Sequence, residues 1–159
     1  MAGGCRGRQL AASMVQDGYA VRITTRTEDA REAIEASGAE CWIGTPDRLA
    51  TLRGALENVT ILCWLLGSAA GSEQQLRALH TSRLEFFLTQ AIDTTVRGLL
   101  YEARGAPGSA GLLGEGEVIA RRLAERNAIP AAFLAADPDD GERWLADARA
   151  AVAALLVGA

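Results

Sequence analysis

Hydrophobic residues recur along the chain in two alternating patterns, one helical and one extended. Segment 7–17 has Leu10 and Met14 at helical spacing, and Gly18 then predicts the end of this helix. Segment 20–25 follows as a short strand rich in β-branched residues. The same alternation predicts further helices at 28–37, 48–56, 72–93, 117–127 and 142–156, and further strands at 40–43, 59–66, 96–101 and 130–135.

Strands that alternate with helices predict a three-layer, doubly wound parallel sheet joined by right-handed crossovers. Segment 59–66 is almost wholly apolar, which is typical of a parallel strand covered on both faces. Segment 105–116 is rich in glycine and is predicted to be a loop. Because no repeat or linker interrupts the pattern, we expect a single domain over residues 1–159.

Composition limits the class of protein. Hydrophobic residues make up 49% of the chain and charged residues 23%, a balance typical of globular domains. The net charge of −4 argues against a nucleic-acid binder, which would need a basic face. The longest apolar runs, 60–67 and 150–157, are too short to cross a bilayer, and the N-terminus lacks the apolar stretch of a signal peptide.

The chain has three cysteines, Cys5, Cys41 and Cys63, and one histidine. This odd number without metal-ligand spacing argues against both a disulfide framework and a metal site. We therefore expect reduced cysteines and a cytoplasmic setting.

A glycine-rich turn, Ala2-Gly3-Gly4-Cys5-Arg6-Gly7, immediately precedes the first predicted helix. It approximates the G-x-G-x-x-G fingerprint that binds a dinucleotide pyrophosphate at a helix N-terminus. Gly4 would let the backbone approach the phosphates, and Gly7 would let the helix pack closely on the sheet. Arg6 could add a charge-assisted contact.

The fingerprint normally follows a first strand at the centre of the sheet, but only Met1 precedes this turn. Without that strand, two neighbouring strands would lose a pairing partner and expose their edges. A late start of the chain, a strand from a neighbouring chain, or a rearranged strand are the alternatives.

The type of dinucleotide is indicated by the residue at the end of the strand that follows the first helix. NAD-preferring domains carry an acidic residue about 20 positions after the glycines. Here Thr24-Thr25-Arg26 occupies this place, without a carboxylate. A guanidinium at Arg26, supported by the Thr25 hydroxyl, suits a 2′-phosphate and favours NADP over NAD.

These motifs resemble the atypical and extended short-chain dehydrogenase/reductase families, including the NmrA-like and NAD-dependent epimerase/dehydratase groups. The resemblance covers roughly residues 2–135. It implies a Rossmann fold in which the following residues contact the cofactor: Gly3, Gly4, Cys5, Arg6, Gly7, Thr25, Arg26, Pro46, Asp47, Leu66, Gly67 and Ser68. Within this set, Pro46 and Asp47 would lie near the adenine, and Leu66, Gly67 and Ser68 would border the ribose and nicotinamide.

The chain departs from the active members of these families, which use a Tyr-x-x-x-Lys pair. It contains no lysine, and Tyr101 is followed three residues later by Arg104. Tyr101 and Glu102 are therefore only weak catalytic candidates: Tyr101 is expected to pack the strand end, and Glu102 to be a capping or solvated carboxylate. His80 is expected at a surface or an interface.

Three functions remain open. The first is an NADP(H)-binding protein without the catalytic pair, acting as a dinucleotide binder or redox sensor. The second is an active reductase or epimerase-like enzyme with an unusual acid and a small-molecule substrate. The third is a scaffold that forms a homodimer through the 72–93 helix, with Leu84, Phe87 and Leu88 at the interface.

Overall fold

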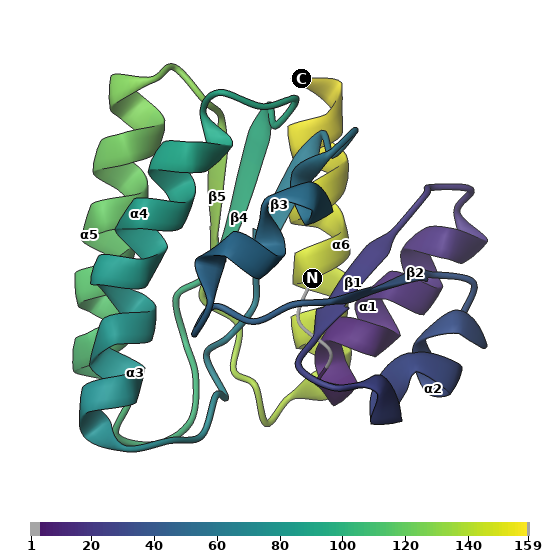
Figure 1. The fold of residues 1–159 in the computed structure, drawn as a ribbon, viewed down its shortest axis with the longest axis horizontal. Helices are drawn as coiled ribbons and strands as arrows, with labels where there is room; N and C mark the ends of the chain where they lie inside the picture. The colour runs from purple at the N-terminus through teal and green to yellow at the C-terminus, as the bar shows by residue number, and fades with distance from the viewer. Residues whose placement is uncertain (1–3, 159) are drawn as a thin grey trace. The chain divides into compact units, whose positions relative to one another are not determined.

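The computed structural model describes residues 4–158. It divides into two compact units, Met1–Ala55 and Leu56–Ala159, and each is described below by itself. Both units are α/β, and every strand pair in them is parallel (Figure 1).

The first unit is a two-stranded sheet with helices packed on it. Its elements are α1 (Cys5–Gln16), β1 (Arg22–Thr25), the 3₁₀ turn η1 (Glu28–Ala30), α2 (Arg31–Glu35), β2 (Glu40–Ile43), and the 3₁₀ turns η2 (Leu49–Leu52) and η3 (Gly54–Leu56). The last residue of η3 already belongs to the second unit. Helix α1 packs on β1 and α2 on β2, and together they bury a small apolar core that includes Ala11, Ile23 and Ile34.

The end of α1 follows directly from its sequence. Gly18 adopts φ +90°, and its N–H donates to the carbonyl of Val15 while the N–H of Tyr19 donates to that of Met14. This is a Schellman ending, which needs a left-handed residue that glycine supplies without strain. The predicted stop at Gly18 is confirmed.

The second unit is a three-layer arrangement around a sheet in the order β3-β4-β5. Its elements are β3 (Ile61–Trp64), α3 (Glu73–His80), α4 (Ser82–Ala91), β4 (Gly98–Glu102), α5 (Ala110–Arg126), β5 (Ala131–Leu134) and α6 (Gly141–Val157). Helix α5, with α3 and α4 packed against it, covers one face of the sheet, and α6 covers the other (Figure 1). All five residues of β4 are buried, as expected for the central strand of such a sheet.

Polar residues cap the starts of two helices in this unit. Ser72 and Gln75 form a reciprocal capping box at the start of α3, and Asp140 accepts from the N–H of Arg143 at the start of α6. The single helix predicted over 72–93 is wrong in one respect, since it breaks at Thr81, whose φ of −122° and ψ of −94° are not helical.

The grouping of the strands explains why there are two sheets. A doubly wound Rossmann sheet has the strand order 3-2-1-4-5-6. Taking β1 to β5 as the second to sixth strands of that order, omission of the first strand leaves two groups, β2-β1 and β3-β4-β5, which are those observed. Among residues 4–158 no strand precedes α1, and β1 and β3 each pair on one side only. The predicted Rossmann-like fold without its first strand is confirmed.

Two predicted segments are wrong. Residues 48–56 form 3₁₀ turns rather than an α-helix. Residues 105–116 are not one loop, because α5 already begins at Ala110 and contains Gly111, Gly114 and Gly116. Gly116 is needed for close packing, since a Cβ there would lie 2.1 Å from the Tyr101 hydroxyl oxygen. Glycine here reflects tight packing between elements rather than a flexible loop.

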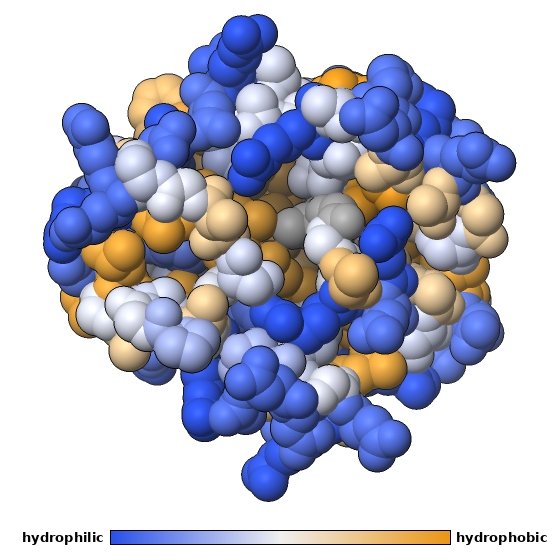
Figure 2. All heavy atoms as spheres, turned by 90° about the horizontal axis from the view of Figure 1, so that it is seen from below, coloured by the Kyte–Doolittle hydropathy of each residue, from blue (hydrophilic) through white to orange (hydrophobic). Residues whose placement is uncertain are grey.

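The surface is mixed. Figure 2 shows hydrophilic side chains over much of the face seen from below, with smaller hydrophobic patches between them. Leu84, Phe87 and Leu88, expected at a dimer interface, are instead buried inside the second unit, whereas Phe86 is exposed. Within residues 4–158 no helix is long and apolar enough to span a bilayer.

Candidate functional site

The N-terminus of α1 is open in the first unit. Gly4 is the N-cap residue with extended backbone angles, and no side chain caps the helix there. A Cβ built on Gly4 would meet no atom within 4 Å, so there is space for a group beside Gly4 itself. The first turn carries no acidic residue, and Arg6 is half-buried within it. Uncapped N–H groups and the positive end of the helix dipole are suited to bind a phosphate.

Gly7 and Cys5 occupy opposite environments in the same turn. Gly7 is buried. Cys5 is exposed, and Arg8 Nη2 lies 3.6 Å from its Sγ. Gly3, also predicted to be part of the turn, lies outside the described residues.

The other predicted contacts of the first unit follow the carboxyl ends of β1 and β2. Because Thr25 pairs with Ile43, Arg26 and the 44–47 turn leave the sheet at the same edge. Helix α1 packs on β1, and the short connection 17–21 joins the C-terminal end of the helix to the start of the strand. The N-terminus of α1 therefore lies toward the carboxyl end of β1, which is the same edge. The first unit therefore brings the glycine turn, Arg26 and the segment with Pro46 and Asp47 to one side.

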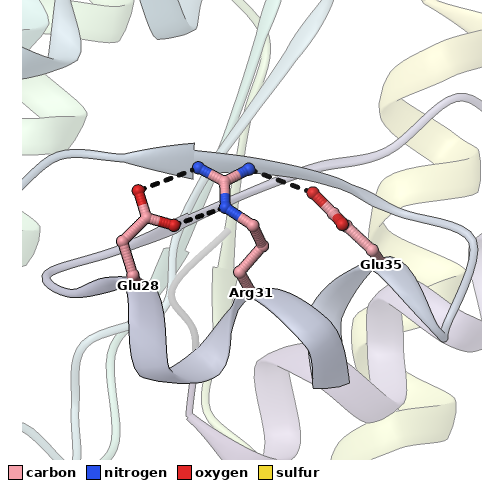
Figure 3. Close-up of polar contacts among 3 residues, drawn as sticks. All are labelled: Glu28, Arg31 and Glu35. Atoms are coloured by element: carbon pink, nitrogen blue, oxygen red, sulfur yellow. Dashed lines mark hydrogen bonds and ion pairs between the residues drawn. The ribbon is translucent and has the colours of Figure 1, made fainter.

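Two arginines follow β1, and they differ in their partners. Arg31 hydrogen-bonds both Glu28 and Glu35 (Figure 3), which lowers the pKa of Glu28. The charge of Arg31 is thus compensated locally. Arg26 is exposed, and its side chain makes no hydrogen bond or ion pair within the part of the chain that the structure describes. Arg26 is therefore available to an anion at this edge.

In the second unit, the predicted cofactor segment Leu66-Gly67-Ser68 follows β3. Ser68 is exposed, Leu66 is half-buried and Gly67 is buried. The N–H of Gly67 donates to Glu102 Oε2 at 2.7 Å, and its carbonyl accepts from the N–H of Ala106 at 3.1 Å. Both backbone groups of Gly67 are thus hydrogen-bonded within the protein. Leu66 and Ser68 are therefore the residues of this segment with surface accessible to a ligand.

The two weak catalytic candidates, Tyr101 and Glu102, lie at the end of β4 and are both buried. The Tyr101 hydroxyl donates to the carbonyl of Leu113 at 3.1 Å and lies 3.3 Å from Nδ1 of His80. Burial raises the pKa of Tyr101 well above its usual range. A buried phenol that holds its proton this firmly is poorly suited to donate it to a substrate.

Glu102 was expected to be a capping or solvated carboxylate, and the second expectation is wrong. Its Oε2 accepts from Gly67, and its Oε1 accepts from Nε1 of Trp144 on α6 at 2.9 Å. The carboxylate is therefore bonded to two N–H donors inside the second unit.

His80 was expected at a surface or an interface, but it is buried. It lies at the end of α3, beside Tyr101. The helical pattern could have indicated this, because His80 follows the buried Leu79 and lies four residues before Leu84. A polar side chain on that face needs an internal partner, and sequence alone did not identify Tyr101 as the partner.

The described cysteines are all free thiols. Burial raises the pKa of Cys63 to about 11 and also raises that of Cys41. Within the described chain no group of three or more histidine, cysteine or acidic residues is arranged to hold a metal ion.

No protein-family model matches this chain, and no curated protein sequence matches it. Solved structures do match. Gox2253 superposes with a TM-score of 0.68 at 18% identity, covering 83% of this chain and 48% of its own. The triphenylmethane reductase of Citrobacter sp., in complex with NADP(H), gives 0.62 at 16% identity over 83% of this chain and 46% of the reductase.

A third match is the UDP-glucuronic acid 4-epimerase of Bacillus cereus in complex with NAD. Its TM-score is 0.61 at 12% identity, over 84% of this chain and 54% of the epimerase. This chain spans about half the length of these proteins. The chain therefore has the Rossmann-like α/β fold of NAD(P)-binding extended short-chain dehydrogenase/reductase-type proteins, which confirms at the level of the fold the resemblance inferred from its motifs.

Proposed function

We propose that this chain binds a nicotinamide dinucleotide, with NADP(H) preferred over NAD(H). The observation that carries the proposal is the open N-terminus of α1, where Gly4 leaves space and no side chain caps the helix. The fold supports it, because two of the matched structures contain NADP(H) or NAD. The pyrophosphate would lie at this helix end, where N–H groups and the helix dipole favour negative charge.

The preference for NADP(H) depends on Arg26. Its guanidinium is exposed at the end of β1, and its neighbour Arg31 is already paired with two carboxylates. A 2′-phosphate is the group that distinguishes NADP from NAD, and an arginine at this strand end would bind it. Thr25, Pro46 and Asp47 leave the sheet at the same edge and would border the adenosine.

The role we propose is binding rather than catalysis. The chain has no lysine for a Tyr-x-x-x-Lys pair, and its one tyrosine near the expected position, Tyr101, is buried. A dinucleotide binder or redox sensor needs only the phosphate-binding edge, whereas a reductase also needs an accessible acid.

The test is a fluorescence titration of the purified chain with NADPH and with NADH. We expect saturable binding of both, with NADPH bound more tightly. Arg26→Ala should weaken NADPH binding roughly 10- to 100-fold, the range for one lost charge-assisted contact, and should leave NADH binding nearly unchanged. Arg126→Ala removes an exposed arginine at the C-terminal end of α5 and serves as the matched control. Absence of binding to either dinucleotide would refute the proposal.

A further inference from the structure

The segment after β2 in the first unit forms a tight turn that is closed by its own hydrogen bonds. The N–H of Arg48 donates to the carbonyl of Thr45 at 2.9 Å, which makes 45–48 a four-residue turn. Pro46 occupies the second position of this turn, where the fixed φ of proline is favoured. The Thr45 hydroxyl oxygen also accepts from the N–H of Asp47 at 3.2 Å. The local sequence therefore favours one conformation for the segment that contains Pro46 and Asp47.

Thr51 ties both ends of this turn together. Its hydroxyl oxygen accepts from the N–H of Thr45 at 2.9 Å, and its hydroxyl donates to the carbonyl of Arg48 at 2.7 Å. The backbone N–H of Thr51 donates to the same carbonyl at 2.8 Å. A residue without a hydroxyl at position 51 would lose both side-chain hydrogen bonds at once.

Thr51 is itself attached to the sheet of the first unit. Its carbonyl accepts from Nε1 of Trp42 on β2 at 2.8 Å. The indole is fixed in turn, because the guanidinium of Arg22 lies 5.5 Å from its ring centroid and a Cβ on Gly54 would lie 2.7 Å from the ring. The 45–48 turn is therefore connected to β2 through Thr51 as well as through the chain itself.

The same segment is joined to the strand that ends before Arg26. The N–H of Gly44 donates to the carbonyl of Thr25 at 2.8 Å, and Arg26 follows directly. A Cβ on Gly44 would lie 2.8 Å from the carbonyl oxygen of Thr51, so the backbone is packed here without room for a side chain. Arg26 and the 45–48 turn thus leave backbone that is hydrogen-bonded and closely packed, all within the first unit.

We propose that Thr51 is a positioning residue, which holds the 45–48 turn in the conformation that contacts the adenosine of a bound dinucleotide. This inference rests on the proposed dinucleotide binding and extends it to a residue that does not touch the ligand. A loop that becomes ordered only on binding costs conformational entropy, and a turn already held by Thr51 avoids that cost. Because Thr51 is exposed, water competes for its hydrogen bonds, and they contribute little to the stability of the chain. The hydroxyl therefore acts mainly on ligand affinity.

The contact itself is tested by amide NMR of the ¹⁵N-labelled chain. Thr51→Val keeps the shape of the side chain but removes the acceptor of the Thr45 amide, so the Thr45 amide proton should shift upfield. Thr51→Ser keeps the hydroxyl and should leave this signal closer to its original position. Thr89→Val is the matched control, since the Thr89 hydroxyl bonds only the carbonyl of Glu85 in its own helix α4. An unmoved Thr45 signal in Thr51→Val would overturn the proposal.

The ligand part is tested by titration of the same variants with adenosine 2′,5′-bisphosphate. Thr51→Val should weaken binding about tenfold, whereas Thr51→Ser should stay within about threefold of the unmodified chain. Thr89→Val should bind as the unmodified chain does. Melting temperatures of all variants are compared at the same time, so that loss of affinity is assigned only to folded protein. If Thr51→Val does not fold, Thr51→Ala takes its place.

The outcomes separate this inference from the proposed function. If the unmodified chain binds adenosine 2′,5′-bisphosphate and folded Thr51→Val binds it as tightly, the positioning role is refuted and the proposed function stands. A loss in Thr51→Ser as large as that in Thr51→Val also refutes the positioning role, because the hydroxyl would then be irrelevant. If the unmodified chain binds neither this ligand nor a dinucleotide, the proposed function fails and the inference fails with it.

Discussion

The carboxyl edges of the two units are built from similar βα elements but have opposite character. In the first unit, α1 begins without a side-chain cap, Gly4 has open space around it, and Arg26 is exposed. In the second unit, the segment after β3 is bonded through both backbone groups of Gly67, to Glu102 and Ala106. The first edge is open to an anion, whereas the second is held rigidly by its own side chains. The residues proposed to bind the ligand and the residues that hold the Gly67 backbone in place are thus separated along the chain.

The largest effect is expected where the second unit is most tightly packed. In Gly116→Ala the new Cβ would lie 2.1 Å from the Tyr101 hydroxyl oxygen and 2.7 Å from the carbonyl oxygen of His80. The Tyr101 hydroxyl cannot withdraw without breaking its hydrogen bond to the carbonyl of Leu113. Overpacking of this kind should lower the free energy of unfolding by about 3 kcal/mol. Urea denaturation measures this loss, and a variant as stable as the unmodified chain would show that the packing is looser than described.

The next effect should separate ligand affinity from stability in the first unit. Gly4→Ala adds a methyl group that meets no atom of the protein within 4 Å, at a φ of −68° that alanine adopts freely. Stability should change by less than about 1 kcal/mol. NADPH affinity should fall about tenfold, because the methyl group would occupy the approach to the helix N–H groups. Thermal melting and fluorescence titration measure the two quantities, and unchanged affinity would argue against a phosphate at this helix end.

A smaller effect is expected from pH in the second unit. Burial lowers the pKa of His80 below its ordinary value of 6.5. The unfolded chain therefore binds the proton more readily than the folded chain, and stability should be complete above about pH 6.5 and decline as the pH falls below it. His80 is the only histidine, so His80→Phe should remove this slope. Denaturation curves at several pH values provide the test, and an unchanged slope in the variant would exclude His80 as its source.

The smallest effect should be a gain. Gly114 lies in α5 two residues before Gly116, but a Cβ there meets no atom within 4 Å. Gly114→Ala should stabilise the chain by about 0.5–1 kcal/mol, the difference between glycine and alanine in a helix interior. Its melting temperature compared with that of Gly116→Ala tests whether the same helix has one crowded and one open side. Destabilisation by Gly114→Ala would contradict the open side.

Local patterns predicted most of the fold. Apolar periodicity located all five strands, and β2 was predicted with the bounds that the structure has. Gly18 marked a real helix boundary. The start of α5 was missed because Gly111, Gly114 and Gly116 resemble a loop locally. Gly116 is explained by Tyr101 and His80, which are distant from it in sequence.

The site was predicted unevenly for the same reason. Groups that act through the backbone or through their own charge, such as Gly4 and Arg26, can be identified from their place after a turn or a strand. The environments of His80 and Glu102 depend on partners 21 to 42 residues away, Gly67, Tyr101 and Trp144, which only the packed structure brings together. Sequence alone therefore predicted the residues of the first edge and missed the side-chain contacts that hold the second.

The most direct test of the account is an amide NMR titration with adenosine 2′,5′-bisphosphate, the adenosine end of NADP. It contains the 2′-phosphate and lacks the nicotinamide, so it addresses the first unit alone. The account predicts saturable shifts of the amides of Gly4, Arg26 and Asp47, and much weaker binding of 5′-AMP. Unchanged amides at this edge, at ligand concentrations that saturate known NADP-binding domains, would contradict it.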